Sequence, residues 1–436
     1  MQSFDYCCGG YTSDTPSGGV AAAKPWITYF AAPSPNNDPT GTYPSYGTPG
    51  LAAAGVSASH VYAYIDDSHV YSGDAQFNNI KPGGLDASAE ALDCAGNPVT
   101  EKNSNGYLSD PWQPAALALY DNDVTTQYNY STEFGIVFID DVNAYLYNDN
   151  NDLPCHNGIQ WSEPASSTAY AAIVDSMSVA GLLAGHTAPK YLLNALSAIT
   201  IQAGGSTANI ANAINQFTGL ANVFGFVCDE CLGDTKNAII GLNTSGELVN
   251  QWIVTEDAEI ATVNAQKLYL LQDQDSISTG AMSYTARTYA FASFMLVWDP
   301  VYTAYQNDYY GYPGNGKNPN STNPQIHVFP EEELTAYNPI VTYPSTSPGI
   351  GALQDPAGTY FREYQSCFYN GTSVGACAFV VNPSSSAHAK PMLNGTYGHT
   401  MTISNQLSVL DGGTVSLTGA AVPSTIPGLS AYILLP

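Results

Sequence analysis

Two doubled acids are the residues whose types and spacing could do chemistry. Asp140 and Asp141 directly follow an apolar run at residues 136–139, and Asp229 and Glu230 directly follow a second run at residues 224–228. Two carboxyl groups that flank one bond are the equipment of glycoside hydrolysis. One of them attacks the anomeric carbon or activates a water, while the other protonates the leaving oxygen.

We assign Asp140 as the nucleophile and Glu230 as the general acid/base of such a reaction. Asp141 and Asp229 are the alternatives, because the alternation of side chains along a strand turns only one of two consecutive residues to a given side. The competing interpretation is that these acids cap the helices that follow them. Doubled acids on two strands favour catalysis over capping.

Similar apolar runs, each ending in an acidic residue, recur along the chain and indicate what positions these acids. Runs of this length are typical of strands buried on both faces, as in parallel sheets. Carboxylates at the carboxyl ends of such strands occupy the active-site rim of a (β/α)8 barrel. The runs lie at residues 61–65, 136–139, 224–228, 268–271 and 294–298.

Other side chains at these strand ends could hold a sugar. Carboxylates could bind sugar hydroxyls and aromatic rings could stack on sugar rings, with helix capping or a loop role as the alternative. The carboxylates are Asp66, Asp67, Asp273 and Asp299, and the rings are Trp298 and Tyr302.

The pattern along the chain predicts alternating strands and helices, followed by strands alone. Barrel strands are expected at residues 26–31, 61–65, 87–92, 135–141, 191–196, 223–228, 267–271 and 294–298, with the third strand the least regular. Helices are expected at residues 110–128, 167–184, 207–220, 256–264 and 281–292. Antiparallel strands are expected at residues 360–367, 376–381, 399–404, 414–417 and 431–435. We therefore predict an α/β protein with an N-terminal extension (1–24), a (β/α)8 TIM barrel (25–354) and a C-terminal antiparallel β-sandwich (355–436).

The charge balance excludes one class of partner. The 436 residues include 37 Asp and Glu against 10 Lys and Arg, which gives a formal net charge of -27 at pH 7. Phosphate backbones would be repelled, so we expect no nucleic-acid partner. Because carboxylates titrate near pH 4, such a surface approaches neutrality in acid, and we expect a protein that works in an acidic exterior.

The eight cysteines indicate an oxidising compartment. Cys367 and Cys377 flank the turn signal Asn370-Gly371 and predict a cross-hairpin disulfide, whereas the pairing of Cys7, Cys8, Cys94 and Cys155 cannot be deduced. The Cys228–Cys231 pair is interpreted as a structural disulfide or free thiols. No membrane span is expected, and we predict a secreted chain whose signal peptide has been removed.

Four short segments stand out: Leu108-Ser109-Asp110-Pro111, Phe138-Ile139-Asp140-Asp141-Val142-Asn143, Phe361-Arg362-Glu363-Tyr364 and Val380-Val381-Asn382-Pro383-Ser384. They resemble secreted glycosyl hydrolase barrels, distantly similar to endo-α-1,4-polygalactosaminidase-like and dextranase-like enzymes. The resemblance covers residues 60–436 and implies a retaining mechanism with Asp140 as nucleophile and Glu230 or Asp229 as acid/base. The Cys228-Asp229-Glu230-Cys231 arrangement departs from the family pattern.

The sequence therefore predicts an extracellular glycoside hydrolase that acts on a polysaccharide or oligosaccharide with no cofactor. A run of Asn and Asp at residues 148–152 is interpreted as a solvated turn, with structural calcium as its alternative. The rival functions are a non-catalytic carbohydrate-binding protein and a self-assembling matrix or surface protein on the same fold. The sugar, the linkage and the oligomeric state are left open.

Overall fold

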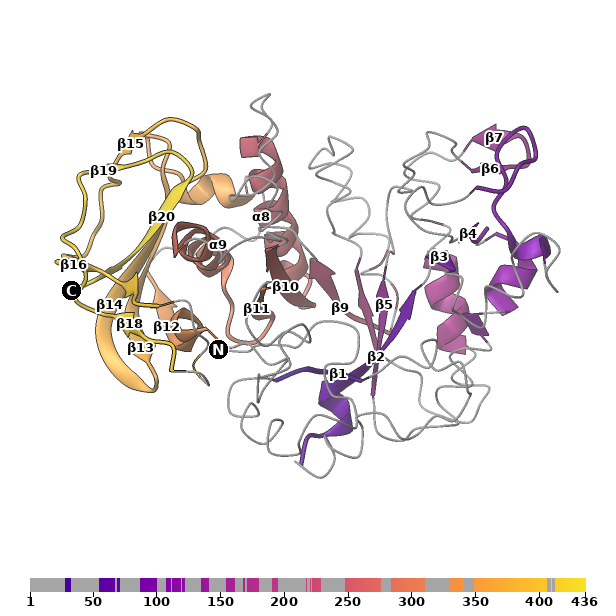
Figure 1. Cartoon of the computed structure of the whole chain (residues 1–436), viewed down its shortest axis with the longest axis horizontal. Helices are drawn as coiled ribbons and strands as arrows, with labels where there is room; N and C mark the ends of the chain where they lie inside the picture. The colour runs from indigo at the N-terminus through magenta and orange to yellow at the C-terminus, as the bar shows by residue number, and fades with distance from the viewer. Residues whose placement is uncertain are drawn as a thin grey trace. The chain divides into compact units, whose positions relative to one another are not determined.

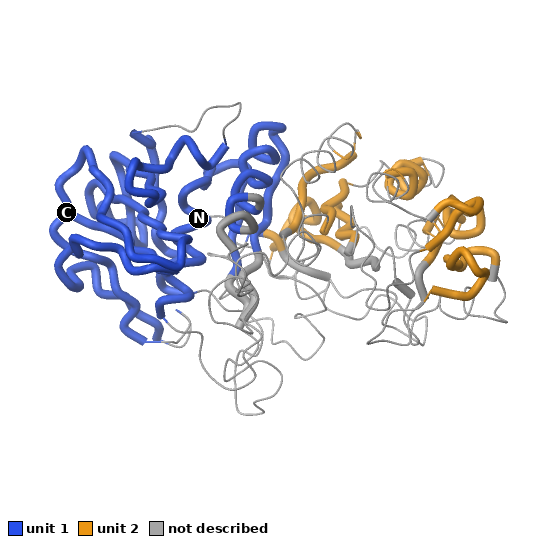
Figure 2. Tube along the Cα trace, turned by 90° about the horizontal axis from the view of Figure 1, so that it is seen from above, with its two compact units in different colours: residues 1–6, 22–28, 228–436 blue, residues 7–21, 29–227 orange. Residues whose placement is uncertain are grey.

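The computed structural model describes a large part of the chain in several stretches. These are residues 28–32, 55–66, 69–70, 87–99, 107–110, 112–118, 120–121, 135–140, 154–160, 168, 171–179, 190–194, 217, 220, 222–228, 248–275, 284–309, 329–340, 349–405, 409 and 412–436. The chain divides into two compact units (Figure 2). The first unit contains residues 1–6, 22–28 and 228–436, and the second contains residues 7–21 and 29–227.

The second unit is built on parallel strands whose order in the sheet is their order in the sequence. The strands are β1 (Phe30–Ala32), β2 (Val61–Asp66), β5 (Ile136–Asp140), β8 (Lys190–Leu193) and β9 (Val223–Cys228), and they pair in that order (Figure 1). A doubly wound sheet reverses its strand order at a switch point, whereas a (β/α)8 barrel adds each strand beside the previous one. The observed order is that of a barrel.

The apolar runs form strands because both of their faces are buried. All four residues from Ile136 to Ile139 are at most 1% exposed, and Tyr191, Leu192 and Leu193 are fully buried. A strand covered on both faces reads as a continuous apolar run and not as an alternation. The described helical residues 114–118, 120–121 and 171–179 come between these strands in the sequence.

The first unit continues the alternation with α8 (Leu248–Asn264), β10 (Leu268–Asp275), α9 (Tyr284–Val297) and β11 (Thr303–Tyr309). β10 and β11 pair in parallel. The predicted strand at residues 294–298 is wrong, because helix α9 continues to Val297 and the strand begins at Thr303. Short apolar runs do not distinguish a strand from a helix buried on all sides, and α9 packs against β11 as well as β14 and β20.

The predicted third strand at residues 87–92 is also wrong. Residues Ala87–Ala89 form a 3-10 turn, after which isolated antiparallel bridges join Glu90 to Ser109 and Leu92 to Pro98. β2 pairs directly with β5. The segment contains no β-branched residue, so nothing in it favours a buried strand.

The C-terminal part forms an antiparallel sheet in the order β12-β13-β14-β20-β16. Its strands are β12 (Leu334–Pro339), β13 (Tyr360–Tyr369), β14 (Thr372–Asn382), β16 (His399–Thr400) and β20 (Ser430–Leu435). The same part of the chain contains two separate two-stranded sheets. One pairs β15 (His388–Ala389) with β19 (Thr425–Ile426), and the other pairs β17 (Thr402–Ile403) with β18 (Val415–Ser416). The predicted fold class, a parallel barrel sheet with a C-terminal antiparallel domain, is confirmed, while the exact domain boundaries stay a prediction.

Side chains from β13 close the end of helix α9. Arg362 Nη1 donates to the carbonyls of Leu296 at 2.9 Å and Trp298 at 3.2 Å, and the Tyr364 hydroxyl donates to the Met295 carbonyl at 2.7 Å. The last carbonyls of a helix have no partner within the helix. These contacts tie the antiparallel sheet to α9. None of the described helices is long and apolar enough to cross a membrane.

Candidate functional site

The carboxyl ends of neighbouring strands bring polar residues to one level of the second unit's sheet. Asp66 ends β2 and Asp140 ends β5, and the two are register partners across the parallel pair. The next strand continues this level, because the Asn194 amide donates to the Ile139 carbonyl at 2.8 Å. Adjacent strands lie about 4.8 Å apart. The backbone therefore sets Asp66, Asp140 and Asn194 in one row at the edge where a barrel carries its active site.

Several predicted site residues lie outside the residues that the structure describes. They are Asp67, Asp141, Asp229 and Glu230. Cys228 ends β9, the strand that pairs with β8, and Asp229 and Glu230 are the next residues in the sequence. The pairing of Asp140 with Glu230 stays a prediction.

Asn194 is a polar residue of this edge that the sequence analysis missed. It is 2% exposed and follows β8 directly. An asparagine after a strand is common in ordinary turns. Asn194 also lacks the adjacent acidic residues that drew attention to the ends of the other strands. Its register with Asp140 becomes visible only once β5 and β8 are paired.

The first unit has a separate register pair of polar residues, two positions before the carboxyl ends of its parallel strands. Asp273 of β10 is the register partner of Asn307 of β11. Asp273 was predicted as a substrate-binding residue beyond the end of a strand at residues 267–271, but β10 continues to Asp275 and Asp273 lies within it. Its contact with a sugar stays a prediction. Asn307 was not predicted, because β11 was assigned to the wrong residues.

Trp298, Asp299 and Tyr302 lie in the turn between α9 and β11. Trp298 is 3% exposed and its ring packs on Tyr337, with 5.6 Å between the centroids. Asp299 Oδ1 accepts from the amides of Val301 at 2.8 Å and Tyr302 at 3.0 Å. These contacts show that Trp298 packs in the interior and that Asp299 stabilises the turn, which was the alternative interpretation for Asp299. Their predicted contacts with a sugar stay untested.

A second constellation belongs to the loops that follow β2 and β5 in the second unit. Asp110 Oδ2 lies 3.0 Å from His156 Nδ1, and Asp110 Oδ1 accepts from the Trp112 amide at 3.0 Å. The rings of Trp112 and His156 are 5.1 Å apart. Ile159, the cross-strand partner of His156, is 73% exposed. The cluster thus combines a buried carboxylate, an oriented imidazole and apolar surface.

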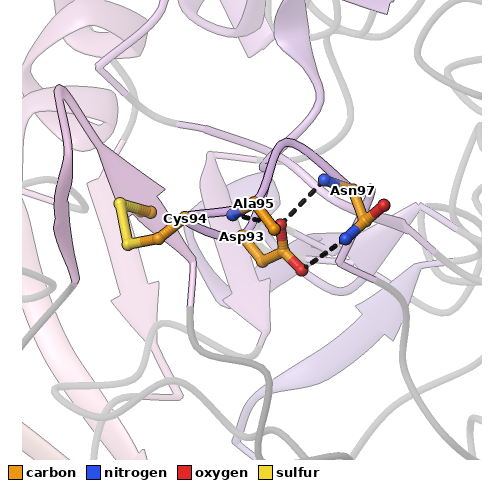
Figure 3. Close-up of a disulfide and its surroundings, with 5 residues drawn as sticks. Asp93, Cys94, Ala95 and Asn97 are labelled. Atoms are coloured by element: carbon orange, nitrogen blue, oxygen red, sulfur yellow. Dashed lines mark hydrogen bonds between the residues drawn. A yellow bond between two sulfur atoms is a disulfide. The ribbon is translucent and has the colours of Figure 1, made fainter.

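A disulfide joins these two loops covalently. Cys94, in the segment that follows β2, is bonded to Cys155, in the segment that follows β5 (Figure 3). Beside it, Asp93 Oδ1 accepts from the amides of Ala95 and Asn97, both at 2.8 Å, and these bonds hold the turn. The sequence contained the hairpin signal Asn157-Gly158, but it could not identify a partner so distant along the chain.

Glu90 is a buried acid in the same loop region. It is 7% exposed, and burial raises the pKa of its carboxyl group from the ordinary value of 4.5 to about 7. A carboxylic acid with such a pKa remains largely protonated in mildly acidic solution.

The described stretches contain no group of three or more His, Cys, Asp or Glu that could hold a metal ion. The calcium alternative concerned residues 148–152, which lie outside the described residues.

Comparison with known proteins finds similarity among solved structures. No family model matches the sequence, and no curated protein matches it. The glycoside hydrolase domain of PelA from Pseudomonas aeruginosa is 11% identical, with 70% of this chain and 94% of that chain covered and a TM-score of 0.41. A GH31 dextranase from Flavobacterium johnsoniae, complexed with glucose, is 10% identical, with 99% and 51% covered and a TM-score of 0.45. Aspergillus fumigatus Ega3, complexed with galactosamine, is 11% identical, with 65% and 84% covered and a TM-score of 0.36.

Proposed function

We propose that the chain is an extracellular glycoside hydrolase that cleaves a polysaccharide with two carboxyl groups and retention of configuration. Asp140 is its nucleophile, and Glu230 is the acid/base, with Asp229 as the alternative. Asp66, the register partner of Asp140, would hydrogen-bond the sugar beside the reacting carbon.

The observation that carries this proposal is the row of Asp66, Asp140 and Asn194 along one edge of a parallel sheet. That edge is where barrel enzymes hold their reacting groups. Glu230 follows β9, two strands along the same sheet. A retaining mechanism needs its two carboxyl groups about 5 to 5.5 Å apart, and this is the separation that the proposal requires of Asp140 and Glu230.

The Trp112 and His156 pair would extend the binding site along the polymer. Trp112 offers an aromatic face, and Asp110 accepts from one ring nitrogen of His156 so that the other is left to bind a hydroxyl. Sugars are bound by aromatic faces combined with oriented polar groups. His156→Ala should raise KM and leave kcat almost unchanged, whereas an unchanged KM would remove this residue from the site.

The two disulfides of the described residues, Cys94–Cys155 and Cys367–Cys377, support a location outside the cell. Disulfides persist in oxidising compartments. The net charge of -27 supports an acidic medium, because protonation would bring the surface toward neutrality. Secretion with intact disulfides, followed by loss of activity on reduction, is the expected behaviour.

The test is a screen of the full chain on a polysaccharide panel between about pH 3 and 7. Asp140→Asn and Glu230→Gln are each expected to lower kcat at least about a hundredfold, since each removes a group required in the transition state. Asp355→Asn is the matched control. Asp355 accepts from the amides of Ala357 and Thr359 in a turn of the antiparallel domain, and its replacement should leave turnover unchanged.

The outcomes separate the rival functions. Full turnover by both site variants would overturn the assignment of the two carboxyl groups. Retention on a polysaccharide gel with no turnover by the wild type would indicate a carbohydrate-binding protein.

A further inference from the structure

Helix α8 carries two buried glutamates for which the described residues supply no hydrogen-bond partner. Glu256 is 0% exposed and Glu259 is 1% exposed, and their spacing of three places them on the same side of the helix. Among the described residues, none of their four carboxyl oxygens has a partner. Buried polar groups are nearly always hydrogen-bonded, so this pair requires a physical explanation.

The groups around the pair come from every element that packs on α8. Tyr269 of β10 is fully buried, and its hydroxyl likewise has no partner in the described part of the chain. Asp257 of α8 accepts from the Ile350 amide at 2.8 Å; that amide belongs to the 3-10 turn η6 (Gly349–Leu353), which contributes no titratable group. The remaining titratable groups that act on the pair are Tyr289 of α9 and Tyr360 and Arg362 of β13.

The local charge does not balance if both glutamates are ionised. Arg362 is the cation that acts on Glu259, whereas Glu256 faces the negative charges of Glu259 and Asp257. An uncompensated charge in a protein interior costs so much that the group takes up a proton instead. Accordingly, burial raises the pKa of both glutamates well above the ordinary value, and Arg362 opposes the rise only for Glu259.

We propose that Glu256 and Glu259 are held as uncharged acids in the folded chain, so that the stability contributed by the packing of α8 depends on pH. The packing stabilises the fold in acid, and this stabilisation is lost as the pH rises. The proposal concerns stability and does not depend on the proposed hydrolase activity.

The direction follows from proton linkage. The unfolded chain releases these protons above about pH 4.3, where a free glutamate titrates, while the folded chain keeps them. Stability from the pair is therefore complete below that pH and is lost as the pH rises toward the folded-state pKa. Within that window the ratio of folded to unfolded protein should fall up to about tenfold per pH unit for each glutamate.

Glutamine tests the proposal because it has the shape of a protonated glutamate and does not titrate. Glu256→Gln, Glu259→Gln and the double variant would be compared with the wild type by urea unfolding of the full chain between about pH 4 and 8. At pH 4 the variants should match the wild type. At pH 8 the double variant should have a folded-to-unfolded ratio at least about tenfold higher, with the larger share from Glu256→Gln.

Glu363→Gln is the matched control for a buried glutamate that is fully hydrogen-bonded. Glu363 is 0% exposed, and its carboxylate accepts from the Asn394 amide at 2.9 Å, Asn394 Nδ2 at 2.8 Å, the Gly395 amide at 2.8 Å and the Tyr397 hydroxyl at 3.0 Å. The side-chain NH2 group of glutamine would face these N–H and O–H donors and could not accept from them. This variant should therefore be less stable than the wild type at pH 8.

A Glu256→Gln variant that is destabilised at pH 8, like this control, would overturn the proposal, because it would mean that a charged carboxylate is needed. An independent readout is the infrared carbonyl band of a protonated carboxyl group. Because Glu90 is also partly protonated at pH 7, the band is read in the Glu90→Gln protein. That protein should show the band at pH 7, and its absence there would also overturn the proposal, even if the Glu256 and Glu259 variants failed to fold.

Discussion

Asp110 shows how much a single carboxylate can hold together. Its Oδ1 accepts from the Trp112 amide, and its Oδ2 accepts from Gln113 Nε2 at 3.1 Å and lies 3.0 Å from His156 Nδ1. The helix predicted at residues 110–128 begins at Asp110, and these first two contacts are those of a helix N-cap. The third contact ties the helix start to the β6 (Cys155–His156) hairpin strand.

Replacement of Asp110 should therefore cost more than a helix cap alone. Asp110→Ala is expected to lower the free energy of unfolding by about 1 to 2 kcal/mol, the upper range for a lost N-cap, because His156 loses its partner as well. Asp110→Asn keeps an acceptor for the Trp112 amide and should lose less. Urea unfolding measures both; equal stability of all three proteins would contradict the expectation.

At the residue scale, the sequence predicted a disulfide between cysteines close together in the chain but not one between cysteines far apart. Asn370 and Gly371 have φ values of 47° and 71°, as a tight hairpin turn requires, and the predicted Cys367–Cys377 disulfide is confirmed across it. The Cys94–Cys155 bond joins residues 61 positions apart. Such a partner depends on the tertiary course of two loops, which no local pattern encodes.

At the scale of elements, burial determined where the sequence succeeded. The runs at 136–139 and 268–271 became strands as predicted, but residues 294–297 belong to α9, a helix whose last nine residues are all buried. A helix between two sheets has no polar face, so its period of 3.6 disappears from the sequence. The same limit holds for the candidate site: Asp66 and Asp140 end β2 and β5 as the apolar runs indicated, whereas the register neighbours Asn194 and Asn307 were not predicted, and the roles of all these residues stay predictions.

The two disulfides should differ in what they contribute. Chain-entropy estimates give about 4 kcal/mol for a closed loop of about 60 residues and about 3 kcal/mol for one of about 10. The Cys94→Ser/Cys155→Ser protein should therefore be less stable than the Cys367→Ser/Cys377→Ser protein. Denaturant midpoints of both variants measure the difference, and the reverse order would show that native-state contacts outweigh loop closure.

At the scale of the whole molecule, net charge and buried acids favour the same conditions. The net charge of -27 at pH 7 creates self-repulsion that weakens as carboxylates are protonated. Glu90 adds to this trend. Since its pKa is raised, its contribution to stability is present below about pH 4.5 and is lost as the pH rises through about 7.

Glu90→Gln should reproduce the wild-type stability at pH 4 and exceed it at pH 8, because glutamine remains neutral throughout. Asp93→Asn provides the opposite case. Hydrogen bonds from Asn97 lower the pKa of Asp93, so its contribution is present at pH 8 and is lost in acid, and the variant should be less stable than the wild type at pH 8. Thermal unfolding midpoints at both pH values measure the pair, and shifts of the same sign at pH 8 would contradict this account.

The Cys94–Cys155 bond has one further consequence, because the chain between its two cysteines includes strand β5. Those residues form a closed covalent ring. A single protease cut inside the ring would leave both fragments joined and the strand that carries Asp140 still tethered at the uncut end. The cleaved protein would migrate as one species until a reductant separated the pieces, so a single proteolytic cut there would leave one covalent molecule.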